Sequence, residues 1–83
     1  MHRDRLQIMA EALDIAREGA LKTHIMYKTN LSFNQLYFYL NLLLDRKLLE
    51  TIKREDSEKT LYRTTDKGLK FLKSYKEIKK SLT

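Results

Sequence analysis

The fold is decided by residues 22–46, which read KTHIMYKTNLSFNQLYFYLNLLLDR. The first part of this stretch predicts a short helix over residues 24–29, with Thr23 as its N-cap. Only Asn30 and Leu31 separate this helix from the start of the next one. Two helices joined by so short a turn predict a helix-turn-helix unit.

The second helix of this unit begins with a capping signal. Ser32 and Gln35 have the spacing of a capping box, in which the serine caps the helix and the glutamine reaches back to the cap. The apolar pattern that follows predicts a helix to about Arg46, with one face buried. Phe38 and Leu42 are predicted to lie farthest from the core. The buried face is expected to carry Phe33, Leu36, Tyr39, Leu40, Leu43 and Leu44.

Another helix is predicted before this unit. Apolar residues at spacings of three and four indicate an amphipathic helix from about Asp4 to Glu18. Gly19 follows its last turn, where a glycine adopts a left-handed cap at the least cost. The apolar stripe consists of Leu6, Met9, Leu13 and Ala16.

A hairpin and a last helix are predicted after the unit. Residues 48–53 and 60–64 contain strand-forming side chains, and the wholly polar residues 54–59 between them are typical of a hairpin tip. Thr65 is expected to cap a final helix, with Asp66 in the first turn, where the helix dipole favours a carboxylate. The order is helix, helix, helix, strand, strand, helix. This is a mainly α fold with one β-hairpin.

Length and composition exclude several classes of protein. Eighty-three residues make one domain, and 42% hydrophobic with 34% charged residues is typical of a folded globular chain. The sequence contains no cysteine, which excludes disulfides, thiol catalysis and cysteine-based zinc sites. The longest nearly apolar stretch, residues 36–44, is far shorter than the roughly 20 residues that span a bilayer. No signal-peptide pattern opens the chain, so we expect a cytoplasmic protein that does not bind a membrane.

The net charge of +6 is concentrated in the second half of the sequence. Residues 1–45 carry five basic and five acidic groups, which sum to zero. Residues 46–65 carry six basic against four acidic groups, and residues 66–83 carry six lysines against two acidic groups. A basic half favours a polyanionic partner, with nucleic acid ahead of a membrane. The alternative is that the lysines only solvate a helix surface.

These segments together resemble a winged helix. More narrowly, the chain resembles the small archaeal winged helix-turn-helix DNA-binding proteins that dimerise through a C-terminal helix. The resemblance divides the chain into a winged helix-turn-helix domain over residues 1–65 and a dimerisation helix over residues 66–83, packed on the same domain. It implies double-stranded DNA binding by a nucleoid-associated homodimer, in transcriptional regulation or in chromatin. It rests on residues 22–27 (KTHIMY), 30–33 (NLSF), 39–44 (YLNLLL), 48–50 (LLE) and 62–68 (YRTTDKG).

In such a fold the third helix enters the major groove of DNA, and exposed residues near its N-terminus meet base edges. Asparagine and glutamine pair bidentately with adenine, and an aromatic side chain can touch the methyl group of thymine. The alternatives are ordinary solvation for the amides, and packing on the hairpin or on a partner chain for Phe38 with Leu42. At 100° per residue, the candidate base-reading side chains are Asn34, Gln35, Tyr37, Phe38 and Asn41.

Phosphate contacts must come from elsewhere, because the third helix is almost uncharged. Such contacts give salt-dependent affinity without sequence information. Glu55, Asp56 and Glu58 make the hairpin tip acidic, so the strand bases are expected to carry the contacts of this wing. The candidates on the second helix, at the start of the third and on the hairpin are Lys22, Thr23, Lys28, Ser32, Lys53, Arg54, Lys59 and Arg63.

The last helix carries an apolar stripe at the spacing of a coiled-coil seam. We interpret this stripe as the dimer interface, and the alternative is a helix folded back on its own first helix. Leu69 and Leu72 lie to one side and are expected to pack on the domain core. The predicted interface consists of Phe71, Tyr75, Ile78 and Leu82.

The sequence offers no recognisable catalytic constellation. His2 and His24 have no nearby set of metal ligands, and Gly19 and Gly68 stand alone rather than in a phosphate-binding loop. We therefore expect no enzyme activity, no cofactor, no metal and no small-molecule ligand. The rival to DNA binding is a protein-interaction module with the same fold, which the acidic wing tip and the predicted exposure of Phe38 and Leu42 favour. RNA binding is a weaker third option.

Overall fold

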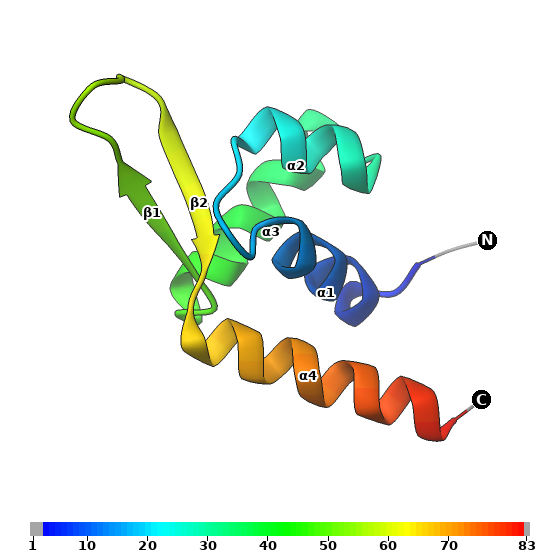
Figure 1. Cartoon of the computed structure of the whole chain (residues 1–83). Coiled ribbons are helices and arrows are strands. Elements are labelled where there is room, and N and C mark those ends of the chain that lie inside the picture. The colour runs from blue at the N-terminus through cyan, green and yellow to red at the C-terminus, as the bar shows by residue number, and fades with distance from the viewer. Residues whose placement is uncertain (1–2, 83) are drawn as a thin grey trace.

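The computed structural model describes residues 3–82 and has the predicted order of elements (Figure 1). Three helices precede a two-stranded antiparallel hairpin, and a fourth helix follows it. The predicted mainly α fold with one hairpin is confirmed. The bounds are α1 Arg5–Ile15, α2 Lys22–Thr29, α3 Phe33–Asp45, β1 Leu49–Lys53, β2 Thr60–Thr64 and α4 Asp66–Ser81.

α1 ends earlier than predicted, at Ile15 rather than Glu18. The cause is the carbonyl of Ala16, which accepts hydrogen bonds from the backbone N–H of Gly19 at 3.1 Å and of Thr64 at 2.9 Å. The chain leaves the helix here to meet the hairpin. Gly19 then adopts the predicted left-handed conformation, with φ of 103°.

α2 begins earlier than predicted, with Leu21 as its N-cap, so Thr23 lies inside the first turn and is not the cap. The cause is a short antiparallel bridge that the sequence did not predict. The N–H of Ala20 donates to the carbonyl of Tyr62 at 2.9 Å, and the N–H of Tyr62 donates back at 2.8 Å. The bridge keeps the chain extended up to residue 20, and α2 starts directly after it.

α3 starts with the predicted capping box. The Oγ of Ser32 accepts from the N–H of Gln35 at 3.2 Å, and the Oε1 of Gln35 accepts from the N–H of Ser32 at 2.9 Å. The predicted burial of Phe33 is wrong, because this side chain is 55% exposed. Phe33 is the first residue of the helix and precedes the buried stretch, which begins at Leu36. Its ring contacts Tyr37 instead of the core.

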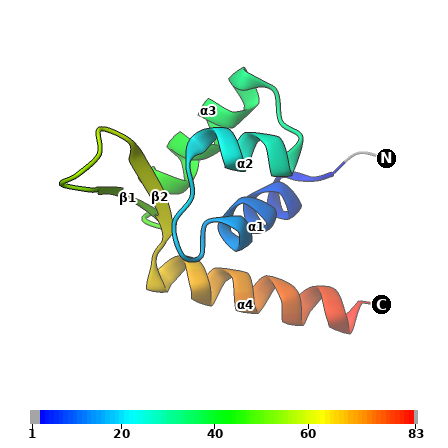
Figure 2. The same ribbon diagram turned by 45° about the horizontal axis from the view of Figure 1, so that its top comes forward.

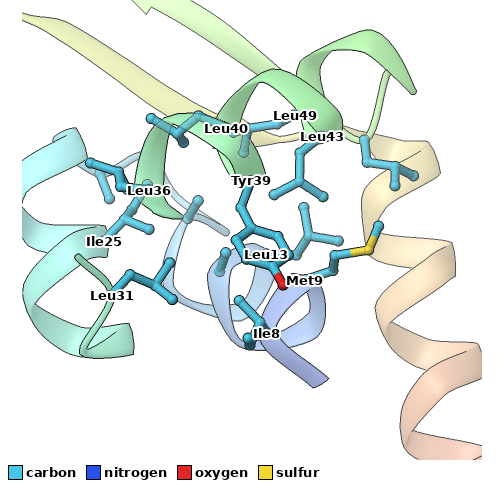
Figure 3. Close-up of a cluster of buried hydrophobic side chains, with 14 residues drawn as sticks. Ile8, Met9, Leu13, Ile25, Leu31, Leu36, Tyr39, Leu40, Leu43 and Leu49 are labelled. Carbon is cyan, nitrogen blue, oxygen red and sulfur yellow. The ribbon is translucent and has the colours of Figure 1, made fainter. Parts of the chain in front are cut away.

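The core lies between α1, α2, α3 and β1 (Figure 3). Leu13 and Leu43 are completely buried at its centre. Leu42, predicted among the residues farthest from the core, is partly buried and packs against it, as does Leu44. The labelled members of the cluster in Figure 3 are Ile8, Met9, Leu13, Ile25, Leu31, Leu36, Tyr39, Leu40, Leu43 and Leu49.

The hairpin projects from the helices but is fastened to α1 at its base (Figures 1 and 2). Thr64 is almost fully buried, and its Oγ1 donates a hydrogen bond to the carbonyl of Leu13 at 2.6 Å. The register pairs Leu49 with Thr64 and Lys53 with Thr60. The base of the wing is therefore continuous with the core, while its tip lies outside it.

α4 runs antiparallel to α1, so its C-terminal end lies on the same side of the molecule as the start of α1 (Figures 1 and 2). Thr65 caps it as predicted, by accepting from the N–H of Gly68 at 3.0 Å. Leu72 is buried as predicted, whereas Leu69 remains 38% exposed. Lys76 reaches Asp14 of α1 with its Nζ 3.4 Å from Oδ1.

The ion pair between α1 and α4 predicts a pH dependence of stability. Partial burial raises the pKa of the Asp14 carboxyl, but the hydrogen bond from Arg17 at 2.8 Å and the charge of Lys76 outweigh burial, so the pKa lies below its ordinary value. A lowered pKa in the folded state stabilises the protein above the unfolded-state pKa, near pH 4, and this contribution disappears as the pH falls through the folded-state pKa.

We therefore expect Asp14→Asn to be less stable than the wild type at neutral pH by less than about 1 kcal/mol, since the pair is half exposed. In urea unfolding at about pH 3, close to the pKa values of carboxyl groups, the difference should shrink. If the variant and the wild type differed in stability by the same amount at both pH values, the loss of stability would not come from the charge of Asp14.

Candidate nucleic-acid interface

The predicted base-reading face of α3 is open to solvent. Asn34 and Asn41 are seven residues apart, which is about two helical turns, so they lie on one side of the helix. Gln35 is also exposed, but its amide oxygen accepts from Ser32 in the capping box. Bidentate pairing of Gln35 with adenine would therefore require breaking this cap. All five predicted side chains are exposed: Asn34, Gln35, Tyr37, Phe38 and Asn41.

The two aromatic candidates lie on opposite flanks of the strip formed by Asn34 and Asn41. The Nζ of Lys22, at the start of α2, lies 5.5 Å from the centroid of the Tyr37 ring and 3.3 Å from its hydroxyl oxygen. The Cζ of Arg5, at the start of α1, lies 5.2 Å from the centroid of the Phe38 ring. Tyr37 therefore faces the α2 side of the molecule and Phe38 faces the α1 side.

A groove between the start of α2 and the hairpin brings together several phosphate candidates. Lys53 is paired with Thr60 in the hairpin register, so it shares the hairpin face that borders this groove. The first turn of α2 holds no acidic residue and has no side-chain cap, and the dipole of a helix start favours an anion. Glu58 is the acidic member of the lining. We call this feature the α2–wing groove, and it is lined by Leu21, Lys22, Thr23, Glu58, Lys59, Thr60 and Tyr62.

Other phosphate candidates lie apart from this groove. Arg63 points to the opposite face of the hairpin, where its Nη2 lies 3.1 Å from Oε2 of Glu50. Arg54 does not line the groove itself but borders an adjoining hollow next to the turn between α1 and α2, which shares Leu21 and Lys59 with the groove. Lys28 is exposed in the last turn of α2, and the hydroxyl of Ser32 serves as the cap of α3. The structure thus gathers Lys22, Thr23 and Lys59 around the groove, places Lys53 on the same face of the hairpin, and places Arg63 on the opposite face.

Phe33 belongs to this surface although the sequence pattern placed it in the core. Its ring lies 4.8 Å from that of Tyr37, measured between centroids, at an interplanar angle of 74°. The sequence signal that could have identified it is its position directly after the N-cap, Ser32. A side chain in the first turn is covered only if another element reaches beyond the helix end.

The predicted dimer stripe of α4 is divided between two environments. Phe71 is partly buried against the core of its own domain, and Tyr75 borders a hollow between α1 and α4. Ile78 and Leu82 are 61% and 82% exposed. The N-terminal half of the stripe is thus used within the chain, and the C-terminal half is open.

Comparisons with known proteins agree with this arrangement. A family model described as winged helix-turn-helix matches residues 2–83. The chain belongs to the winged helix-turn-helix family. The predicted resemblance to this family is therefore confirmed. No curated protein sequence matches the chain significantly.

Solved structures of other proteins share the fold of this chain at low sequence identity. Sso10a-2, a DNA-binding protein from Sulfolobus solfataricus, is 20% identical with a TM-score of 0.79, over 96% of this chain and 85% of that one. AF1382 from Archaeoglobus fulgidus is 17% identical with a TM-score of 0.74, over 95% and 90% of the two chains. ZitR from Lactococcus lactis, in complex with DNA, is 19% identical with a TM-score of 0.60, over 99% and 66%.

Two further findings concern metals and membranes. Across residues 3–82, no three His, Cys, Asp or Glu side chains are grouped so that they could hold a metal ion. His24 is exposed on α2, and His2 lies outside the described residues. None of the helices described here combines the length and the apolar character needed to cross a membrane.

Proposed function

We propose that this winged helix-turn-helix protein binds double-stranded DNA as a homodimer, in the cytoplasm on the nucleoid, as a transcription regulator or a small chromatin protein. The observation that carries the proposal is the position of the open α3 face beside the α2–wing groove. One surface combines amides suited to base edges with lysines suited to phosphates. The proposal includes no enzyme activity, no cofactor and no small-molecule ligand.

In this proposal α3 enters the major groove, with Asn34 and Asn41 toward the base edges. Each asparagine amide can donate to N7 and accept from N6 of adenine. Lys22, Thr23 and Lys59 bind phosphates on one side of the DNA major groove. These contacts fix the position of α3 on the duplex without reading its sequence. Lys53 adds a contact from the end of β1 next to the wing tip, and not from the strand base that the sequence predicted.

The comparisons support this proposal by analogy of fold. Sso10a-2 is described as a DNA-binding protein, PcaV from Streptomyces coelicolor as a transcriptional regulator, and ZitR was solved in complex with DNA. A shared fold raises the expectation of DNA binding, but the site of this chain has to carry the function. The lysines and amides described above are that site.

The homodimer is proposed from the open end of α4. Ile78 and Leu82 are large apolar side chains that their own chain leaves uncovered, and Tyr75 lies next to them on the same stripe. A second copy that covers them would place two α3 helices on one duplex. Their centres would then be roughly 34 Å apart, or a multiple of this distance, to reach successive major grooves.

The proposed function predicts a steep salt dependence of affinity. Fluorescence anisotropy of a labelled random duplex should show affinity falling by roughly a thousandfold to a hundred-thousandfold between 50 and 200 mM salt, if six to ten phosphates are engaged. Lys22→Ala and Lys59→Ala should each lower the slope of log affinity against log salt by about 2, because each variant removes one phosphate-neutralising cation from each subunit of the proposed dimer.

Lys70→Ala is the matched control, because Lys70 is an exposed lysine of α4 outside the α2–wing groove. It should leave the slope close to that of the wild type. If Lys70→Ala lowered the slope as much as Lys22→Ala, the phosphates would not be held at the proposed surface. If no duplex bound at 50 mM salt, the DNA-binding proposal would be wrong, and a protein partner for the exposed Phe38 would replace it.

A further inference from the structure

We propose that Phe33 and Tyr37 form an aromatic reader of thymine methyl groups, which gives the protein a preference for A·T base pairs. This inference rests on the proposed DNA binding and deepens it, because it assigns a base preference to one flank of α3. Its first support is exposure. Phe33 is 55% and Tyr37 40% exposed, although both are large and could contribute to a core.

The two rings are held in place before any ligand binds. They lie four residues apart on one face of α3 and meet edge to face, with centroids 4.8 Å apart. Lys22 also contacts Tyr37, at the ring and at the hydroxyl oxygen. The capping box at Ser32 fixes the backbone on which Phe33 stands. Little side-chain freedom remains to be lost on binding, which favours affinity.

The surroundings of the rings favour a polyanion over a protein segment. Neither α2 nor α3 has an acidic residue in its first turn, and Lys22 connects the ring pair with the α2–wing groove. The apolar group that a DNA duplex presents in its major groove is the methyl group of thymine. The two rings of α3 are complementary to this methyl group, and the neighbouring Lys22 of α2 is complementary to the phosphates beside it.

The neighbouring amides point to the same base pair. Asn34 and Asn41 lie beside Tyr37 on α3, since they are three residues before it and four residues after it. Asparagine is suited to adenine, and an aromatic ring is suited to the methyl group of thymine. The face therefore offers a partner for each base of an A·T pair. Phe38 does not share this position, because it lies on the other flank beside Arg5.

The experiment compares two forms of the same duplexes. Sequences selected from a random pool for tight binding are prepared with thymine and with uracil in its place, so that the two forms differ by the methyl group in the major groove. The wild type should bind the uracil form about fourfold more weakly for each methyl group that the rings bury. Phe33→Ala and Tyr37→Ala should bind the two forms with nearly equal affinity.

Tyr27→Ala is the matched control, because Tyr27 is an aromatic residue of α2 that is 84% exposed and lies outside the ring pair. It should keep the preference of the wild type for thymine. The midpoint of thermal unfolding of Phe33→Ala should stay close to that of the wild type, because the exposed ring of Phe33 contributes little buried apolar surface to the folded state.

Three outcomes would overturn the inference. If the wild type binds both forms equally, the rings do not read methyl groups, while the proposed DNA binding stands. If Phe33→Ala and Tyr37→Ala both keep the full preference for thymine, the preference comes from other residues or from the shape of the duplex. If the salt titration shows no duplex binding, the inference and the proposed function fail together.

Discussion

Replacing Gly68 by alanine is expected to lower the free energy of unfolding by about 3 kcal/mol, at the upper end of what overpacking usually costs. A Cβ atom at this position would lie 2.2 Å from the carbonyl oxygen of Leu48 and 2.6 Å from Cγ2 of Thr64. The backbone cannot yield easily here. The carbonyl of Leu48 accepts from the N–H of Thr65, and Thr65 Oγ1 both caps α4 and donates to the carbonyl of Lys47 at 2.7 Å.

The expected loss of stability is opposite in sign to the usual effect of replacing glycine by alanine in a helix. In an ordinary helix interior, glycine to alanine stabilises by about 0.5–1 kcal/mol, because glycine loses more backbone entropy on folding. Here we expect the midpoint of thermal unfolding, followed by circular dichroism, to fall by roughly 12–24 °C. Ser74→Ala, at an exposed position of the same helix, should change stability by less than about 0.5 kcal/mol. A Gly68→Ala protein more stable than the wild type would mean that α4 is not pressed against Leu48, in the connection before β1, and against Thr64 of β2.

The second large effect is expected at the open end of α4. Tyr75→Glu combined with Ile78→Glu should convert the proposed dimer into a monomer of 10.0 kDa in analytical ultracentrifugation, because two charges would enter an apolar contact without partners. The slope of log affinity against log salt should fall to about half, since one α3 and one α2–wing groove would remain on each duplex.

Two matched variants keep this prediction decisive. Ile78→Glu alone changes a side chain that the single chain leaves 61% exposed, so it should dissociate the dimer without unfolding the domain. Lys73→Glu shifts the charge by the same two units, on a side of α4 about 140–160° away from Tyr75 and Ile78, and should leave the dimer intact. A double variant that still sediments as a dimer would remove α4 from the interface.

Local signals were enough to predict the order of elements. The capping box at Ser32 and the polar tip between two β-rich segments are encoded within a few residues, and the structure has both. The errors concern contacts between distant parts of the chain. α1 ends early because Ala16 pairs with Thr64, and α2 starts early because Ala20 pairs with Tyr62. No window of sequence contains both partners of such a pair.

The candidate site shows the same division. Periodicity was sufficient to predict which side of α3 would be exposed, because the helix geometry fixes 100° per residue. It could not separate Tyr37 from Phe38, since their difference depends on Lys22 and Arg5 from other helices. Nor could it place Phe33, whose exposure depends on how far neighbouring elements extend past the start of α3.

The bridge between Ala20 and Tyr62 has a consequence for the kind of DNA that would fit the proposed surface. Two backbone hydrogen bonds of this bridge join the segment before α2 to the hairpin. Lys22 of α2 and Lys59 of the hairpin therefore lie on two sides of the α2–wing groove whose backbones are held together. The distance between the backbone positions of these two lysines is therefore fixed by the protein, and in the proposed DNA complex it would set the phosphate spacing that both can reach. A DNA sequence whose phosphate spacing already matches this distance would bind without distortion, whereas any other would have to bend or twist to reach both lysines. The wing would thus contribute selectivity through the stiffness of DNA, at base pairs that no side chain touches.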